Sequence, residues 1–196
     1  MALLTKSDLL SKVSKASGYY TEGNIRNFAA NELLNEKKAA DRLTQTYDIF
    51  LSHSFEDAIY IKALRDYLVE AGYSVYVDWI EDPQLNRANV TKETAAVLRQ
   101  RMNCCRCLLY ATSDAARKSV WMPWELGYMD AKTKSRVAVA PIVDDSEANN
   151  SFKGQEYLGL YPYLDRTSGR LYVQDATGIW VQFDKWINGA NPMKHT

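Results

Sequence analysis

The sequence has no excess of charge of either sign, because its 24 Lys and Arg residues balance its 24 Asp and Glu residues. A protein that binds the phosphate backbone of a nucleic acid needs a cationic face, so we expect no nucleic-acid partner. No apolar run approaches the ~20 residues of a membrane span, and no stretch typical of a signal peptide follows the N-terminus. We therefore expect a cytoplasmic protein without a membrane partner, whose balanced charge permits self-association.

Histidine and glycine-rich motifs are also scarce. Only two histidines occur and His195 is next to the end, so a histidine-based triad would have to use His53, which no Gly-x-Ser-x-Gly motif accompanies. Cys104, Cys105 and Cys107 form an odd cluster without a second ligand pair, which argues against a disulfide framework and against zinc. The two common glycine-rich phosphate-binding motifs are absent. We expect neither a metal nor a bound cofactor.

What is present is enough hydrophobic sequence, 46% of 196 residues, for one α/β domain with a small extension. Residues 1–46 predict a helical extension. Ser7 is a candidate cap for its first short helix, residues 18–23 end that helix, and a second helix is expected over about residues 24–42. The pattern changes after this segment, and we expect residues 47–190 to form the main domain.

Apolar runs and helical patterns alternate about four times in the main domain. The strands are expected at residues 47–51, 73–78, 106–111 and 137–143, with a further possible strand at 170–173. Helices are expected at residues 54–71, 90–102 and 179–187, and another begins near Trp124. Since the strands are continuous apolar runs, they predict a parallel sheet of about five strands with helices on both faces. Ligands of such sheets bind at the carboxyl ends of the strands.

Glu125 lies beside Trp121 and Trp124 at the start of a helix on this rim. If Pro123 is the first helical residue, Glu125 lies in the first turn and the helix dipole stabilises its carboxylate by ~0.5 kcal/mol. A purely structural role then accounts for a glutamate at this position. If Ser119 caps the helix instead, Trp121 and Glu125 share one face. Position and composition alone leave the structural and the functional interpretations equally open.

A carboxylate among aromatic side chains, without histidine or metal, suits the cleavage of an N-glycosidic bond whose leaving group is already positively charged. The carboxylate stabilises an oxocarbenium-like transition state directly or through a ribose hydroxyl. The nicotinamide of NAD+ is such a leaving group and needs no general acid, because it departs neutral. Aromatic faces can stack on its ring.

Three segments resemble Toll/interleukin-1 receptor (TIR) domains. Residues 47–57 resemble the first strand and loop of the family, and residues 72–78 its second strand, which leads into the BB loop. Ser-x-Trp-x-x-x-Glu-Leu at residues 119–126 is similar to the element of TIR domains that degrade NAD+. The resemblance covers about residues 47–145, with all elements in order, and is to bacterial defence proteins of the Thoeris type.

This resemblance implies a flavodoxin-like three-layer fold and an NAD+ nucleosidase or ADP-ribosyl cyclase. The product would be ADP-ribose or a cyclic or modified ADP-ribose signal in anti-phage defence. The resemblance makes Glu125 the catalytic residue. Candidate substrate-binding residues, from the resemblance and from the strand ends, are Ser52, His53, Phe55, Asp78, Trp79, Ser113 and Trp121. It also implies assembly through TIR–TIR contacts and a downstream effector that senses the product.

Two alternatives stay open: a non-catalytic TIR adaptor module, and an enzyme like the nucleoside 2-deoxyribosyltransferases, with a glutamate nucleophile. The pair Trp121 and Glu125 favours catalysis, and residues 47–57 favour the TIR family. The chain departs from the family pattern in its N-terminal extension. It also departs in the BB-loop segment, residues 79–89, which contains Pro83 but no glycine.

Overall fold

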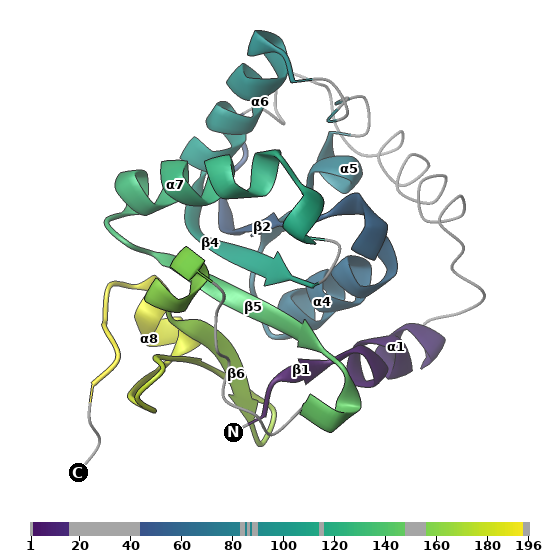
Figure 1. Cartoon of the computed structure of the whole chain (residues 1–196), viewed down its shortest axis with the longest axis vertical. Helices are drawn as coiled ribbons and strands as arrows, with labels where there is room; N and C mark the ends of the chain where they lie inside the picture. Colours follow the sequence, from purple (N-terminus) through teal and green to yellow (C-terminus); the bar gives the residue numbers. More distant parts are fainter. Residues whose placement is uncertain are drawn as a thin grey trace.

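The computed structural model describes residues 2–15, 44–82, 85, 87, 90–113, 116–147 and 156–193. Their strands form an eight-stranded sheet in the order β3-β2-β4-β5-β6-β7-β8, and β1 pairs with β5 (Figure 1). The strands are β1 (Leu4–Thr5), β2 (Tyr47–Ser52), β3 (Val75–Tyr76), β4 (Cys105–Thr112), β5 (Val137–Val143), β6 (Tyr163–Thr167), β7 (Arg170–Gln174) and β8 (Trp180–Gln182).

Helices cover both faces of the sheet. They are α1 (Lys6–Lys15), α4 (Ala58–Glu70), α5 (Asp78–Glu81), α6 (Lys92–Asn103), α7 (Trp121–Thr133) and α8 (Phe183–Ile187). Short 3₁₀ turns are η1 (Phe55–Asp57), η2 (Ala116–Lys118), η3 (Asp145–Glu147) and η4 (Glu156–Leu160). One buried cluster packs α1, α4 and α8 on the sheet, and another packs α6 and α7 on its opposite face (Figure 1).

The apolar runs explain why the central strands are buried on both sides. In β2, Ile49 and Leu51 face the α4 cluster, whereas Phe50 faces the α6 and α7 cluster. β2, β4 and β5 are parallel neighbours, as predicted, and β5 has the predicted bounds, residues 137–143. The expected α/β fold with a mostly parallel sheet is therefore confirmed.

The predicted number of strands, about five, was wrong because β1, β6 and β8, which lie outside the predicted set, also join the sheet. β6 pairs with β5 in parallel, and β7 is antiparallel to both β6 and β8. Ser168 and Gly169, both with positive φ, form the tight turn between β6 and β7. The helix predicted at 179–187 begins only at Phe183, because residues 180–182 pair with β7.

Other helix and strand ends also differ from the prediction. β3 is only Val75–Tyr76, because α5 begins at Asp78 inside the expected strand. The helix predicted from residue 90 begins at Lys92, since the Thr91 hydroxyl caps it by accepting from the Thr94 N–H at 3.1 Å. Backbone capping chemistry, rather than apolar content, sets this helix start.

The N-terminal segment begins with a strand rather than a helix. Leu4 pairs with Ile142 of β5 in parallel. Thr5, and not Ser7, caps α1: its hydroxyl accepts from the Asp8 N–H at 3.1 Å, and its own N–H donates to the Asp8 carboxylate at 3.3 Å. The helix predicted over residues 24–42 lies outside the described residues.

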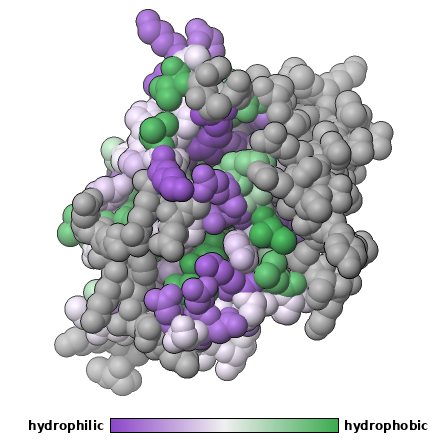
Figure 2. All heavy atoms as spheres, turned by 45° about the vertical axis from the view of Figure 1, so that its right-hand side comes forward, coloured by the Kyte–Doolittle hydropathy of each residue, from purple (hydrophilic) through white to green (hydrophobic). Residues whose placement is uncertain are grey.

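Hydrophobic side chains gather near the middle of the face shown in Figure 2, among mostly hydrophilic described residues. Among the described residues, no helix is both long and apolar enough to cross a membrane. Cys104, at the end of α6, and Cys105 and Cys107, in β4, form no disulfide among the described residues.

Candidate active site

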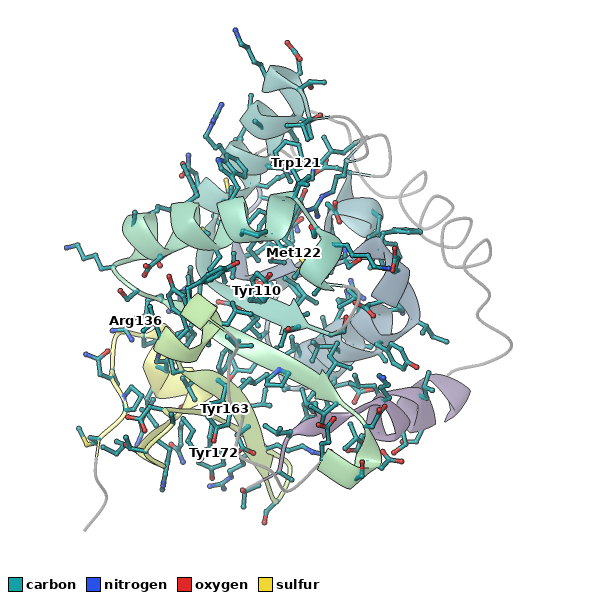
Figure 3. The ribbon with its side chains drawn as sticks, in the orientation of Figure 1. Tyr110, Trp121, Met122, Arg136, Tyr163 and Tyr172 are labelled. Carbon is teal, nitrogen blue, oxygen red and sulfur yellow. The ribbon has the colours of Figure 1, made fainter. Side chains whose placement is uncertain are left out.

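The candidate site lies where the parallel strands end and α7 begins. Ser52 is the last residue of β2 and pairs in register with Tyr110 of β4. Figure 3 shows Tyr110 beneath α7, which carries Trp121 and Met122 at its N-terminal end. This is the carboxyl edge at which ligands of parallel sheets bind.

The start of α7 decides between the two interpretations of Glu125. The helix begins at Trp121, and the Ser119 hydroxyl accepts from the Met122 N–H at 3.3 Å. Pro123 is therefore not the first helical residue, and Glu125 lies beyond the first turn, where the helix dipole has little effect. Trp121 and Glu125 are both buried, as expected for residues four apart on one face.

Glu125 is 0% exposed, and each of its oxygens has a close partner. The Ser52 hydroxyl donates to Oε2 at 2.6 Å, and Nη2 of Arg87 donates to Oε1 at 2.6 Å. Burial raises the pKa of Glu125, while the charge of Arg87 and the hydrogen bond from Ser52 lower it, and the net direction is upward. The site thus holds a buried carboxylate that depends on a neighbouring cation to stay ionised.

Arg87 joins this carboxylate to a second one. Its Nη1 donates to Oδ2 of Asp78 at 2.8 Å, and its backbone carbonyl accepts from Nε1 of Trp121 at 2.8 Å. Arg87 was not predicted, because residues 79–89 carry no recognisable motif apart from their place as the BB-loop segment. The available signal was a charge argument: two carboxylates buried together, Asp78 at the start of α5 and Glu125 in α7, require a cation.

Asp78 and His53 form the other side of the cluster. Nε2 of His53 lies 3.2 Å from Oδ1 of Asp78, and its Nδ1 donates to the Leu51 carbonyl at 2.8 Å. Burial would raise the pKa of Asp78, but Arg87 and His53 hold that pKa well below its ordinary value. Asp78 is therefore a fixed negative charge beside Glu125.

Aromatic side chains line the same region. The Trp79 ring makes edge contacts with Phe55 at 6.3 Å and with His53 at 6.4 Å between ring centroids. Its indole Nε1 is buried without a hydrogen-bond partner among the described residues. Such unsatisfied buried donors are rare in native proteins, and this one lies beside His53 of the candidate site. Trp124 instead stacks on Tyr128 at 5.9 Å, which fits a packing role.

The structure thus brings together Glu125, Ser52, Asp78, His53 and Trp121 around Arg87. Phe55 and Trp79 lie beside His53. Ser113 is bound to a different neighbour: its hydroxyl donates to Asp57 at 2.5 Å and accepts from the Ala116 N–H at 3.3 Å. Within the described ranges, no group of three or more His, Cys, Asp or Glu side chains is arranged to hold a metal ion.

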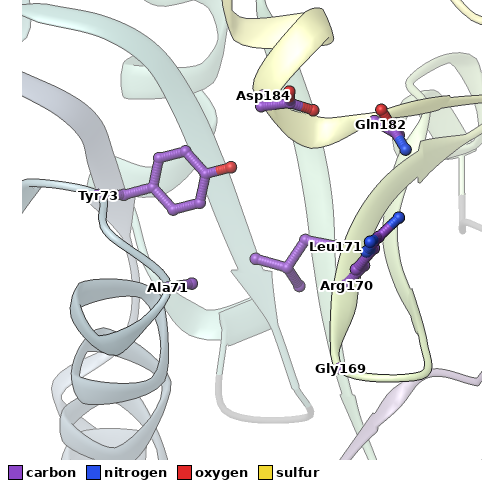
Figure 4. Close-up of a pocket in the computed structure, with 7 residues that line it drawn as sticks. All are labelled: Ala71, Tyr73, Gly169, Arg170, Leu171, Gln182 and Asp184. Atoms are coloured by element: carbon purple, nitrogen blue, oxygen red, sulfur yellow. The ribbon is translucent and has the colours of Figure 1, made fainter.

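A separate open pocket of about 350 Å³ contains none of these residues. It is lined by Ala71, Tyr73, Gly169, Arg170, Leu171, Gln182 and Asp184 (Figure 4). These residues come from the segment between α4 and β3, from β7 and its turn, from the end of β8 and from the start of α8. We place the candidate active site at Glu125 because the carboxylate that lines this pocket, Asp184, is exposed, whereas Glu125 is buried.

The chain is similar to known proteins of one family. A family model described as TIR domain matches residues 49–174. The chain is 43% identical over 196 residues to "Probable 3' cyclic ADP-D-ribose synthase ThsB'" from Bacillus cereus (strain MSX-D12), covering 95% of this chain and 98% of that protein. It is 29% identical over 105 residues to "Putative cyclic ADP-D-ribose synthase TIR2" from Cytobacillus dafuensis, covering 53% of this chain and 26% of that protein.

Proposed function

The chain belongs to the TIR domain family, and we propose that it cleaves NAD+ at the nicotinamide–ribose bond and forms a cyclic ADP-ribose. The observation that carries the proposal is the buried Glu125 carboxylate, held by Ser52 at 2.6 Å on the ligand-binding edge of the sheet. The similarity to proteins named as cyclic ADP-D-ribose synthases supports the product class.

In the proposed reaction the bond between the ribose C1′ and the nicotinamide nitrogen breaks. Both electrons go to the nitrogen, so nicotinamide leaves as a neutral molecule and C1′ becomes an oxocarbenium-like cation. The Glu125 carboxylate stabilises this cation electrostatically, or accepts a ribose hydroxyl hydrogen bond that strengthens as charge develops. A hydroxyl of the same ADP-ribosyl group then attacks C1′ and loses its proton, which closes the ring; capture by water would give linear ADP-ribose.

The neighbouring residues have matching proposed roles. Ser52 orients Glu125, and Asp78 supplies a second negative charge beside it. Trp121, Trp79 and Phe55 offer aromatic faces to the flat rings of the substrate. We also assign substrate contacts to His53 and Ser113, whose polar atoms lie on the same edge of the sheet.

The test is incubation of the purified protein with NAD+ and chromatographic or mass-spectrometric analysis of the products. Glu125→Gln keeps the size of the side chain but removes its charge, and we expect it to lower nicotinamide release by about 100-fold or more. The exposed Glu147 is the matched control, and Glu147→Gln should release nicotinamide at the wild-type rate. Wild-type activity in a folded Glu125→Gln protein would remove Glu125 from the mechanism.

One observation favours the non-catalytic adaptor as a second candidate: Glu125 is 0% exposed and ion-paired with Arg87, so it faces no open space for a substrate. The same assay separates the two. An adaptor releases no nicotinamide at any protein concentration, whereas an enzyme that is inactive as an isolated chain releases it when concentrated or triggered.

We further propose that residues 47–190 act as the TIR unit in the cytoplasm, in anti-phage defence, with residues 1–46 as an N-terminal extension. Homo-oligomerisation is supported by the balanced charge of the chain and by two apolar side chains near the site: Val90 is 70% exposed and Val120 is 68% exposed. A diffusible cyclic product also implies an effector that binds it.

A further inference from the structure

Arg87 already occupies the place that a cationic substrate needs. Its guanidinium lies 2.6 Å from Oε1 of Glu125 and 2.8 Å from Oδ2 of Asp78. The two carboxylate side chains are 0% and 5% exposed, and the Arg87 side chain is 18% exposed. The cation therefore covers two buried carboxylates from the more exposed side of the cluster.

Substrate and guanidinium exclude each other at Glu125. Its Oε2 accepts from Ser52 and its Oε1 from Arg87, so both oxygens are engaged. A reacting carbon must come within ~3–3.5 Å of the group that stabilises it, which is the space that the guanidinium fills. The backbone of Arg87 is held as well, because its carbonyl accepts from Trp121 on the same helix as Glu125.

We propose that Arg87 is an internal competitor of the substrate, and that Glu125 acts only when the guanidinium has given way to the cationic nicotinamide riboside. This inference rests on the proposed function of Glu125. The exchange replaces one cation by another, so one cation faces the two buried carboxylates throughout.

The exchange also explains selectivity by charge. A neutral ring in the place of the guanidinium leaves Glu125 and Asp78 buried side by side, with only His53 facing Asp78. Uncompensated buried charges are strongly unfavourable. Once Arg87 has given way, the two carboxylates therefore make the site select the oxidised, positively charged nicotinamide over its reduced, neutral form.

The experiment measures the affinity for NAD+ and NADH, by calorimetry on freshly mixed protein, together with nicotinamide release. Arg87→Gln keeps hydrogen-bond donors for the carboxylates but removes the cation. We expect it to bind NAD+ about tenfold more tightly than the wild type and to release nicotinamide faster without a trigger, with no gain in NADH affinity. Arg170→Gln, at an exposed arginine of β7, should match the wild type.

Arg87→Lys is the second variant, in case Arg87→Gln fails to give a cooperative thermal transition. One ammonium bridges two carboxylates less well than a planar guanidinium, so NAD+ affinity should rise about threefold. Unchanged or weaker NAD+ binding in a folded Arg87 variant overturns the inference, as does an equal gain for NADH. If the Arg87 variants bind NAD+ more tightly but no variant releases nicotinamide, the competition between Arg87 and substrate is supported and the proposed function is overturned instead.

Discussion

Two buried clusters, each of an arginine and its carboxylate partners, lie at the two ends of the short helix α5. Asp82 follows the end of this helix and Asp78 begins it. The clusters differ in the ratio of negative to positive charges. In the first, Arg101 of α6 donates twice to Asp82, at 2.7 and 2.6 Å, and the Tyr76 hydroxyl donates to the same carboxylate at 2.8 Å. In the second, the single guanidinium of Arg87 serves both Asp78 and Glu125.

The difference separates a structural cluster from a functional one. Arg101 donates twice to the single carboxylate of Asp82, their side chains are 1% and 4% exposed, and the Arg101 guanidinium also lies 5.6 Å from the Tyr76 ring. In the Arg87 cluster one guanidinium faces two carboxylates, and Nε2 of His53 approaches Oδ1 of Asp78 at 3.2 Å. The balanced cluster joins α5 to α6, whereas the unbalanced one retains affinity for a further cation.

Breaking the balanced cluster should have the largest effect on stability. Arg101→Met leaves Asp82 buried without a counter-charge, so we expect a loss of about 3–5 kcal/mol in the free energy of unfolding. Urea denaturation measures it. Arg99→Met, at an exposed arginine of the same helix, is the control and should change little. A wild-type midpoint for Arg101→Met would show that the pair does not hold α5 to α6.

Removing the hydrogen bond that orients Glu125 should have a smaller effect on stability. Ser52→Ala removes a 2.6 Å donor from a buried carboxylate, which should lower stability by about 2 kcal/mol and nicotinamide release by about tenfold. Ser146→Ala, at an exposed serine, serves as the control. If stability falls but the rate does not, Ser52 only supports the fold.

The smallest expected effect is a pH dependence that distinguishes the two carboxylates of the Arg87 cluster. The pKa of Glu125 is raised above 4.5 by burial, so the folded state resists its ionisation and loses stability as pH rises from 4.5 through the folded pKa. The pKa of Asp78 is held below 3.8 by Arg87 and His53, so its contribution is constant above 3.8 and is lost only below that value.

Thermal unfolding of Glu125→Gln and Asp78→Asn between about pH 4.5 and 7 measures how the contribution of each carboxylate to stability changes with pH. The stability of Glu125→Gln relative to the wild type should increase with pH, whereas the deficit of Asp78→Asn should stay constant. The groups facing Glu125 include Ser52, Arg87 and Asp78, with His53 behind Asp78. A deficit of Asp78→Asn that grows with pH in this window would contradict the assigned direction for Asp78.

Local sequence patterns predicted the parts of the molecule that local physics determines. The apolar run at residues 137–143 fits a strand buried on both faces. The Ser119 hydroxyl accepts from the Met122 N–H at the start of the helix whose buried face carries Trp121 and Glu125. The last strands were largely missed because β8 is only three residues long and is held by its pairing with β7. Its helix-compatible sequence gives no sign of that partner.

The candidate site was predicted in its anionic and aromatic residues but not in its cation. Ser52 and Glu125 belong to motifs with recognisable spacing. Arg87 is 38 residues from Glu125 in the chain and reaches it only because the strand ends converge in space. Charge neutrality of a buried cluster is a property of the folded arrangement, and no residue spacing encodes it.

The pairing of β1 with β5 has a consequence for the order of events during synthesis. Lys6, directly after β1, contacts Asp144, directly after β5, across 138 residues of chain. The first strand therefore leaves the ribosome long before its partner exists, and pairing across so large a separation is slow because of the entropy of closing the loop. We expect β1 to join the sheet late, so that Leu3 and Leu4, both 2% exposed in the finished fold, stay accessible to chaperones until β5 has been made.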